Sequence, residues 1–181
     1  LAGTLQGADG ALRADDLQGI IQAFGGSIDI LGRVDSLTAL EGVDLQLHAR
    51  GLDPVSLGDG LPRGLEKLVA GGRVDGTLRL QQATGAWGLD EIDLTLAGAE
   101  RVDLAITGTV QRLTGVPRAQ LEAHYQVRRP EDDRGIGLPP GKGTAVLDLQ
   151  STRQLIGLHA FLGETDLTSI IAVERDEDGI T

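Results

Sequence analysis

The sequence has no cysteine and no methionine, and it is poor in aromatic residues. Without cysteine the chain has no disulfide, no thiolate metal ligand and no thiol nucleophile. One Trp, one Tyr and two Phe in 181 residues leave an apolar content that is mostly aliphatic. Binders of nucleic acids or sugars commonly stack their ligands on aromatic rings, so this composition argues against both classes of ligand.

Basic residues are also in short supply, with 16 Lys and Arg against 27 Asp and Glu and a net charge of -11. Binding to nucleic acid depends on cations that neutralise phosphates. Docking on anionic lipid headgroups depends on clusters of Lys and Arg. The acidic balance therefore predicts no nucleic-acid partner and no polybasic contact with a membrane surface.

Long apolar runs are absent as well: none approaches the ~20 residues needed to span a bilayer, and no signal stretch is present. The sequence starts at Leu1 rather than at Met. We interpret residues 1–181 as a single segment of a longer protein, large enough for one domain. Any membrane anchor is expected outside this segment.

The clearest pattern that is present is an alternation of apolar and polar residues, which is typical of strands with one apolar face. In residues 43–50, Val, Leu, Leu and Ala alternate with Asp, Gln, His and Arg. Similar alternation occurs at 27–34, 73–80, 91–96, 102–110, 119–127, 145–149 and 167–173. We expect roughly eleven strands, many of them about 26 Å long, joined by tight Gly and Asp turns that make neighbouring strands antiparallel.

Two stretches depart from this pattern. Residues 61–70 place Leu and Val at helical spacing before the pair Gly71-Gly72, which predicts one short helix. Residues 129–142 are rich in Pro and Gly, which predicts an exposed loop. The fold class that we expect is all-β, a long, mostly antiparallel curved sheet with one short helix. The alternative is a closed β-sandwich, in which two apolar faces cover each other.

The sequence also contains internal repetition. Residues 32–47 and 108–123 share Gly, Val and two Leu at matching offsets. Related glycines stand at 32, 72, 108 and 143, about one per 35–40 residues, which is a spacing typical of stacked repeat units. We therefore expect β units that extend the assembly in one direction.

Motifs for catalysis and metal binding are incomplete. No Ser stands in a Gly-x-Ser-x-Gly elbow, and the Gly-Lys-Gly-Thr at 141–144 lacks the first Gly of a phosphate-binding loop. His48, His124 and His159 lie far apart, without the spacing of paired metal ligands. The sequence therefore predicts no enzyme, no catalytic residue, no metal site and no cofactor.

Taken together, the strands present one aliphatic face. If two such faces cover each other the result is a sandwich, whereas a face left open would be solvated by lipid tails. Because open apolar surface costs about 25 cal/mol per Å² in water, alternation by itself favours the sandwich.

Several short sequence segments favour the open sheet over the sandwich. The segments are GRVDSL, VDLQL and GLDPVSL between residues 32 and 57, LP and GRVDGTL between 61 and 78, LTGVP at 113–117, and LGETDL and IAV between 162 and 173. Together they resemble the AsmA-like family of bacterial envelope proteins. In the last stretch, Ser169 stands where the family usually has Gly.

This resemblance implies a groove-forming, taco-shaped β-sheet in the periplasm, tethered to the inner membrane by a helix outside this segment. It also implies a role in phospholipid transport and outer-membrane lipid homeostasis. It brings no catalytic residues. The expected partners are phospholipid acyl chains and the rest of the parent chain, and the expected membrane contact runs only through the anchor.

Our leading hypothesis is a β-groove segment that shelters acyl chains on its aliphatic face. The alternative is a structural or adhesive β-sandwich module without a ligand. The residues predicted to contact lipid share one strand face, and they are Ile28, Ile30, Leu45, Leu47, Leu78, Leu80, Leu94, Leu104, Ile106 and Leu121.

Overall fold

The fold is described from a computed structural model, which covers residues 2–8, 11–56, 65–83, 85–113, 118–128, 141–150, 153–162, 165–176 and 179–180. The strands in this part of the chain are β1 (Ala2–Ala8), β2 (Ala11–Ala23), β3 (Gly26–Ser36), β4 (Glu41–Leu52), β5 (Arg73–Ala83), β6 (Ala86–Ala97), β7 (Val102–Arg112), β8 (Arg118–Val127), β9 (Gly141–Leu149), β10 (Arg153–Leu162), β11 (Thr165–Asp176) and β12 (Gly179–Ile180).

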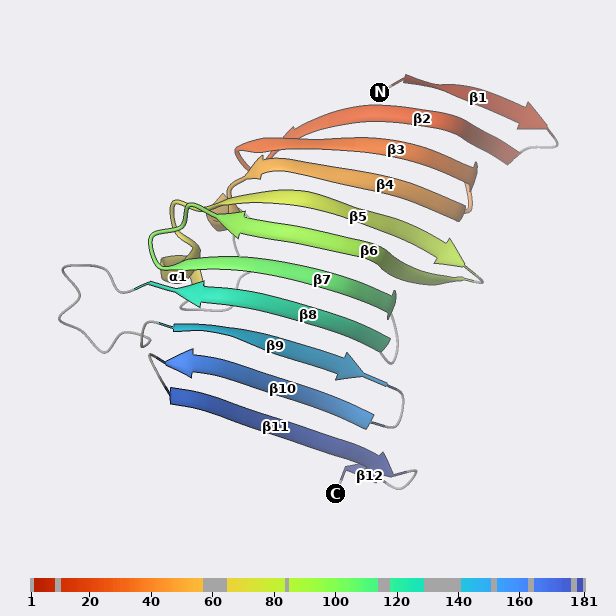
Figure 1. The fold of residues 1–181 in the computed structure, drawn as a ribbon. Coiled ribbons are helices and arrows are strands. Elements are labelled where there is room, and N and C mark those ends of the chain that lie inside the picture. The colour runs from red at the N-terminus through yellow and green to blue at the C-terminus, as the bar shows by residue number, and fades with distance from the viewer. Residues whose placement is uncertain are drawn as a thin grey trace.

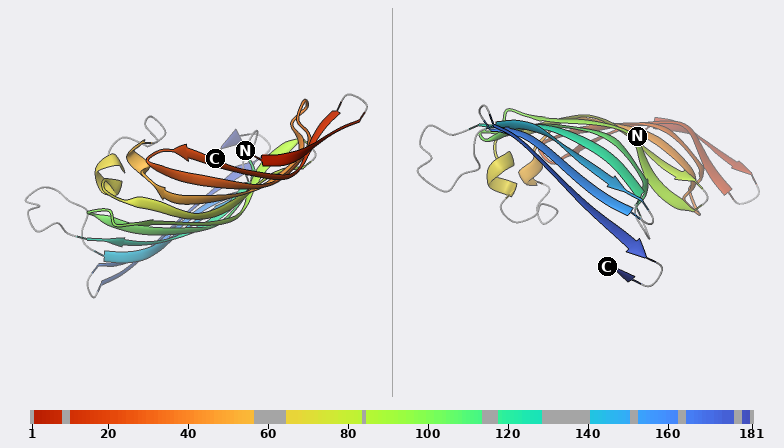
Figure 2. Two further views of the ribbon diagram at one scale, coloured as in Figure 1. Left: turned by 90° about the horizontal axis from the view of Figure 1, so that it is seen from above. Right: turned by 60° about the horizontal axis from the view of Figure 1, so that its bottom comes forward.

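All of these strands belong to one sheet, in which each strand pairs with its neighbours in the sequence (Figure 1). Every pairing is antiparallel. Figure 2 shows that the sheet is twisted and bowed along its strands. The prediction of a long, antiparallel, curved sheet is therefore confirmed. The closed sandwich is not the arrangement of the described strands, since no second sheet faces this one among them.

The helix predicted over 61–70 is short. It is α1 (Leu65–Val69), little more than one turn, and residues 61–64 lie outside the described part of the chain. Two backbone hydrogen bonds hold the turn after α1. The N–H of Gly72 donates to the Val69 carbonyl (3.0 Å), and the N–H of Glu100 donates to the Ala70 carbonyl (3.3 Å). Helix α1 lies on the inner side of the bowed sheet, at one end of the strands (Figure 2).

The predicted loop falls largely on residues that are not described. Residues 129–140 lie outside the described part of the chain. Gly141 and Lys142, the last two residues of the predicted loop, instead begin β9. Their Cα partners on β8 are Val127 and Gln126, so β9 pairs with β8 from its first residue.

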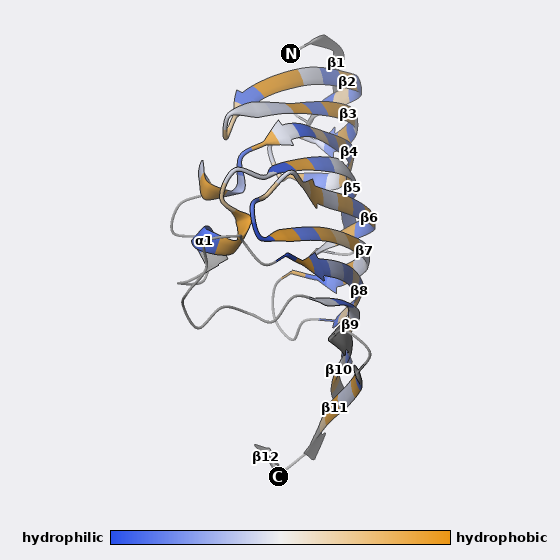
Figure 3. Ribbon diagram, turned by 60° about the vertical axis from the view of Figure 1, so that its left-hand side comes forward, coloured by the Kyte–Doolittle hydropathy of each residue, from blue (hydrophilic) through white to orange (hydrophobic). Residues whose placement is uncertain are grey.

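The register separates the sheet into two faces. Directly opposite residues on antiparallel strands lie on the same side of a sheet, and successive residues alternate between the sides. We call one side the aliphatic face; its register pairs include Ile30 with Leu47, Leu47 with Leu78, Leu94 with Ile106, Gly108 with Leu121, Leu121 with Leu147, and Ile156 with Ile171. The other side, the polar face, carries most of the charged residues. Figure 3 shows the resulting alternation of apolar and polar bands along the ribbons.

A recurring irregularity bends the sheet. Three times, a bulge in one strand faces a positive-φ glycine in the next: at Asp16 (φ 53°) and Gly32 (147°), Gly51 (61°) and Gly76 (141°), and Glu91 (51°) and Gly108 (138°). Bulges of this kind increase the local twist and bend the strand that carries them. The sheet therefore bends within each of the strand pairs β2–β3, β4–β5 and β6–β7.

Only glycine fits the three strand positions that face the bulges. A Cβ at Gly32, Gly76 or Gly108 would lie 2.1, 2.0 or 2.0 Å from a carbonyl oxygen of the neighbouring strand. Gly32 and Gly108 are among the spaced glycines noted in the sequence. Gly72 precedes β5, and the glycine that faces the bulge inside that strand is Gly76.

The buried residues also lie on the aliphatic face. Ala14, Val34 and Val43 form a small cluster, against which Trp87 packs from β6 although β5 lies between. Ile92, Leu96 and Ala119 are buried on the same face. Because no second layer of described strands covers this face, its side chains bury one another through the bending of the sheet toward them.

We expect the close approach at Gly76 to be essential for folding. Gly76→Ala would force a side chain into a positive-φ position and against the Asp93 carbonyl, and we expect a loss of about 3 kcal/mol or more in the free energy of unfolding. The matched control is Gly157→Ala in β10, where φ is not positive and the nearest atom to the new Cβ is 3.8 Å away. There we expect a change of less than about 1 kcal/mol. Urea denaturation checks both, and equal losses would contradict the role given to Gly76.

Candidate functional site

The residues predicted to contact lipid do share one face. The register places all ten on the aliphatic face of six neighbouring strands, β3 to β8. Each is partly buried. These positions are Ile28, Ile30, Leu45, Leu47, Leu78, Leu80, Leu94, Leu104, Ile106 and Leu121. The structure therefore brings them together as a surface; whether that surface holds lipid is a separate question.

The aliphatic face extends beyond the predicted residues. It continues on β2 through Leu17 and Ile21, and on β9 to β11 through Leu147, Ile156 and Ile171. The residues on β2 were missed because the bulge at Asp16 shifts the alternation by one position. Leu147 and Ile171 lie in the alternating stretches 145–149 and 167–173 but were not among the residues predicted to contact lipid. Ile156 on β10 was missed because apolar residues there occupy both faces, so alternation does not distinguish them.

Polar groups are rare on this face. Away from the turns, the described residues at its register positions from β3 to β9 are Leu, Ile, Val, Ala and Gly, apart from Gln82, Trp87 and Tyr125. Gln82 stands directly beside Trp87, and its Oε1 atom is buried without a hydrogen-bond partner. The face therefore offers almost no directional contacts, and what it offers a ligand is nonpolar surface.

Exposure on the face increases toward the two edges of the sheet. In the middle strands the side chains are partly buried, but Ile21 on β2 is 46% exposed, and Ile156 and Ile171 are 49% and 57% exposed. A single-layer sheet leaves its outer strands with neighbours on one side only. Among the described strands, the aliphatic face is therefore most exposed on the outer ones.

Trp87 is the only tryptophan in the sequence, and it lies on this face. Near the start of β6 it packs against the cluster of Ala14, Val34 and Val43. Its carbonyl accepts a hydrogen bond of 2.8 Å from the N–H of Leu113, which ties it to the end of β7.

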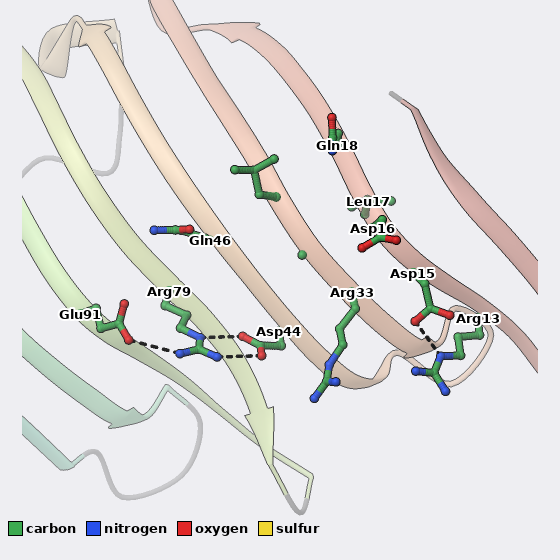
Figure 4. A pocket seen from close by; sticks show the side chains of 12 residues that line it. Arg13, Asp15, Asp16, Leu17, Gln18, Arg33, Asp44, Gln46, Arg79 and Glu91 are labelled. Atoms are coloured by element: carbon green, nitrogen blue, oxygen red, sulfur yellow. Dashed lines mark hydrogen bonds and ion pairs between the residues drawn. The ribbon is translucent and has the colours of Figure 1, made fainter.

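The polar face carries an ion-pair network that sequence reasoning missed. Arg79 on β5 donates to both carboxylate oxygens of Asp44 on β4, from Nε (2.7 Å) and Nη2 (2.9 Å), and to Glu91 on β6 from Nη1 (3.2 Å) (Figure 4). This geometry is the two-pronged arginine–carboxylate contact, which is stronger than a single charged hydrogen bond. The hydrogen bond that Arg79 donates to Asp44 lowers the pKa of Asp44, and the hydrogen bonds that Arg79 donates to Asp44 and Glu91 raise the pKa of Arg79.

This network borders a depression of about 1080 Å³ in the polar face. The depression is lined by Arg13, Asp15, Asp16, Leu17, Gln18, Leu31, Gly32, Arg33, Asp44, Gln46, Arg79 and Glu91. Its lining contains no Ser, Cys or His side chain. Its charges are of both signs and largely paired, as in Arg13 Nε to Asp15 Oδ1 at 2.8 Å. The arrangement therefore links strands across the polar face.

The histidines are separate on the polar face. His124 Nε2 lies 3.1 Å from a Glu122 carboxylate oxygen, and His159 Nε2 lies 2.6 Å from Asp166 Oδ1. His48 stands on β4 opposite Asp29. In the described ranges, no three His, Asp or Glu side chains are gathered as metal ligands would be.

The described part of the chain contains no helix with the length and apolar character needed to cross a membrane. Comparisons with protein-family models, with curated proteins and with solved structures each gave no significant match. The AsmA-like resemblance therefore stays a prediction from the sequence.

The ion-pair network makes a testable prediction about pH. Since Arg79 holds the pKa of Asp44 below its ordinary value of 3.8, the contact stabilises the fold fully above that pH and loses its effect as the pH falls through the lowered value. We expect Arg79→Gln to unfold at a lower temperature than the parent at pH 7, and the difference to shrink below pH 3.8. Thermal unfolding followed by circular dichroism across this range measures it.

Arg33→Gln is the matched control, because Arg33 acts on Asp44 through charge and stands apart from it in Figure 4. We expect a smaller loss at pH 7 from this change. A difference between Arg79→Gln and the parent that stays constant with pH would show that Arg79 acts through packing of its aliphatic stem instead.

Proposed function

We propose that this chain is a β-groove segment of an AsmA-like envelope protein, and that its aliphatic face shelters the acyl chains of phospholipids during transport for outer-membrane lipid homeostasis. One observation carries the proposal. An uncharged aliphatic surface crosses the sheet from β2 to β11, and no second layer of described strands covers it.

The chemistry of the face favours lipid tails over other ligands. Transfer of a methylene group from water to apolar surroundings is worth about 0.8 kcal/mol, so a long acyl chain gains much from an aliphatic surface without directional contacts. A sugar, a nucleotide or a polar peptide side chain would lose hydrogen bonds to water there and find almost none in return. An acyl chain loses none, so it is a ligand that suits such a surface.

The location belongs to the same proposal. The sequence resemblance supports a periplasmic segment, tethered to the inner membrane by a region outside the sequence given. The net charge of -11 supports contact with lipid through tails rather than through anionic headgroups. The polar face, with its paired charges, would then face water while the aliphatic face holds the ligand.

We expect the protein purified from bacterial membranes to carry phospholipid detectable by native mass spectrometry. Leu47→Gln, in the middle of the aliphatic face, should lower the bound fraction several-fold, because it places an amide among the acyl chains. Leu31→Gln is the matched control, since Leu31 lies on the polar face of the adjacent strand and is 48% exposed. Lipid-free protein, or equal losses in both variants, would contradict the proposal and favour a structural or adhesive module.

Trp87 gives a second, site-specific test. A phospholipid with brominated acyl chains quenches tryptophan on contact, so it should reduce the fluorescence of Trp87 on the aliphatic face. A phospholipid brominated on its headgroup should quench much less, because the tails rather than the headgroup contact this face. Quenching that is equal for both lipids, or absent for both, would argue against tail binding near β6.

A further inference from the structure

Tyr125 on β8 is the only tyrosine in the sequence, and it lies on the aliphatic face. Away from the turns, it carries the only hydroxyl among the described residues of that face from β3 to β9. Its Cα partners are Leu104 on β7 and Gly143 on β9, so on one side its neighbour has no side chain. The Tyr125 side chain is partly buried, and it is the one phenol that a ligand on this face could meet.

The hydroxyl of Tyr125 makes no hydrogen bond with any described residue. A tyrosine on an apolar surface usually finds a partner for its O–H, because the ring is apolar and the hydroxyl is both a donor and an acceptor. Here the neighbours that the register gives it are Leu104 and Gly143, whose side-chain positions offer no polar group. The ring therefore belongs to the aliphatic surface, and the hydroxyl is left for water or for a ligand.

The other two polar side chains of the face lie together at the opposite end of the strands. Gln82 ends β5 beside Trp87 near the start of β6. Trp87 packs against the cluster of Ala14, Val34 and Val43, and the Gln82 Oε1 atom is buried. Tyr125, in contrast, stands two residues before the end of β8, at the rim where α1 lies (Figure 1). The face therefore has a phenol with a spare hydroxyl at one end and a packed indole at the other.

The separation of these two ends is comparable with the length of an acyl chain. The register connects Tyr125 through Leu104 to Leu96 on β6. From Leu96 back to Trp87, β6 covers roughly 26–30 Å at about 3.3 Å per residue. The tails of one leaflet fill about half of the ~30 Å hydrocarbon core of a bilayer. A lipid held at Tyr125 could therefore bring only the distal part of its tails near Trp87.

We propose that Tyr125 positions phospholipid on the aliphatic face by donating a hydrogen bond from its hydroxyl to an acyl ester carbonyl, so that the tails point toward Trp87. The inference rests on the proposed function and extends it, since it gives the bound lipid a direction and names the group that sets it. The ester carbonyl is the first hydrogen-bond acceptor that follows the tail, and a phenol O–H is a donor that suits it. A hydrocarbon without an ester would bind the same face without a fixed direction.

The first experiment measures the direction through Trp87, the only tryptophan. A phospholipid brominated near the terminal methyl groups of its tails should quench Trp87 at least about twofold more strongly than one brominated near its esters, because a tail spans only about half of a bilayer core. Equal quenching by the two lipids, or stronger quenching by bromines near the esters, would overturn the proposed direction.

The second experiment removes only the hydroxyl, with Tyr125→Phe. The concentration of diester phosphatidylcholine that gives half-maximal quenching should rise about threefold to tenfold, which corresponds to the loss of one hydrogen bond. The diether analogue has no ester carbonyl, so it should bind the parent and the variant equally. Because the hydroxyl has no described protein partner, the unfolding temperature should stay the same. A lower unfolding temperature would assign the hydroxyl a structural role and overturn the proposal.

Thr144→Val is the matched control, because it removes a hydroxyl from the strand next to Tyr125 but on the polar face, where Thr144 stands opposite His124. It should leave the affinity for the diester lipid unchanged. The proposal is overturned if Tyr125→Phe binds the diester lipid as tightly as the parent does, or if it loses affinity for the diether lipid to the same extent.

A brominated hydrocarbon separates this inference from the proposed function. If the hydrocarbon and both lipids quench Trp87 but Tyr125→Phe changes nothing, the aliphatic face holds tails without help from Tyr125, and only the positioning role fails. If none of the three quenches Trp87, tail binding fails and the positioning role fails with it. Unchanged hydrocarbon binding together with weaker diester binding in Tyr125→Phe is the result that we expect.

Discussion

A sheet with a single layer has to bury its aliphatic side chains against one another, and it can do so only by bending toward them. The bends here are local. At Asp16, Gly51 and Glu91 a strand bulges, and the next strand presents a glycine. Because this glycine has no Cβ, a backbone carbonyl of the strand on its other side can approach closely. The burial of Val34, Val43 and Ile92 on the inner side depends on this geometry, because no second sheet of described strands supplies it.

The polar face contributes to the same geometry, since a carboxylate holds each bulge. Arg13 pairs with Asp15 in β2, the N–H of Gly51 in the β4 bulge donates to Asp75 (2.8 Å), and Arg79 joins Glu91 in the β6 bulge to Asp44. Surface ion pairs are individually weak, but here they lie where the backbone changes direction. The two faces therefore have different roles. Charged residues on the polar face stabilise the bends, and the bends bring the side chains of the aliphatic face together.

Alternation predicted the shared face of the ten aliphatic residues, and the short Gly and Asp turns predicted the antiparallel order, because both depend on local patterns. Alternation failed where the pattern is locally broken, at the bulge of β2 near Asp16 and in β10, where apolar residues occupy both faces. The glycine spacing did not tell which glycines take a positive φ, because that depends on the bulge in the neighbouring strand. Alternation does not predict the number of sheet layers, because that number depends on contacts between strands that are distant in the sequence. The Arg79 network was missed for the same reason, as 35 residues separate its two main partners.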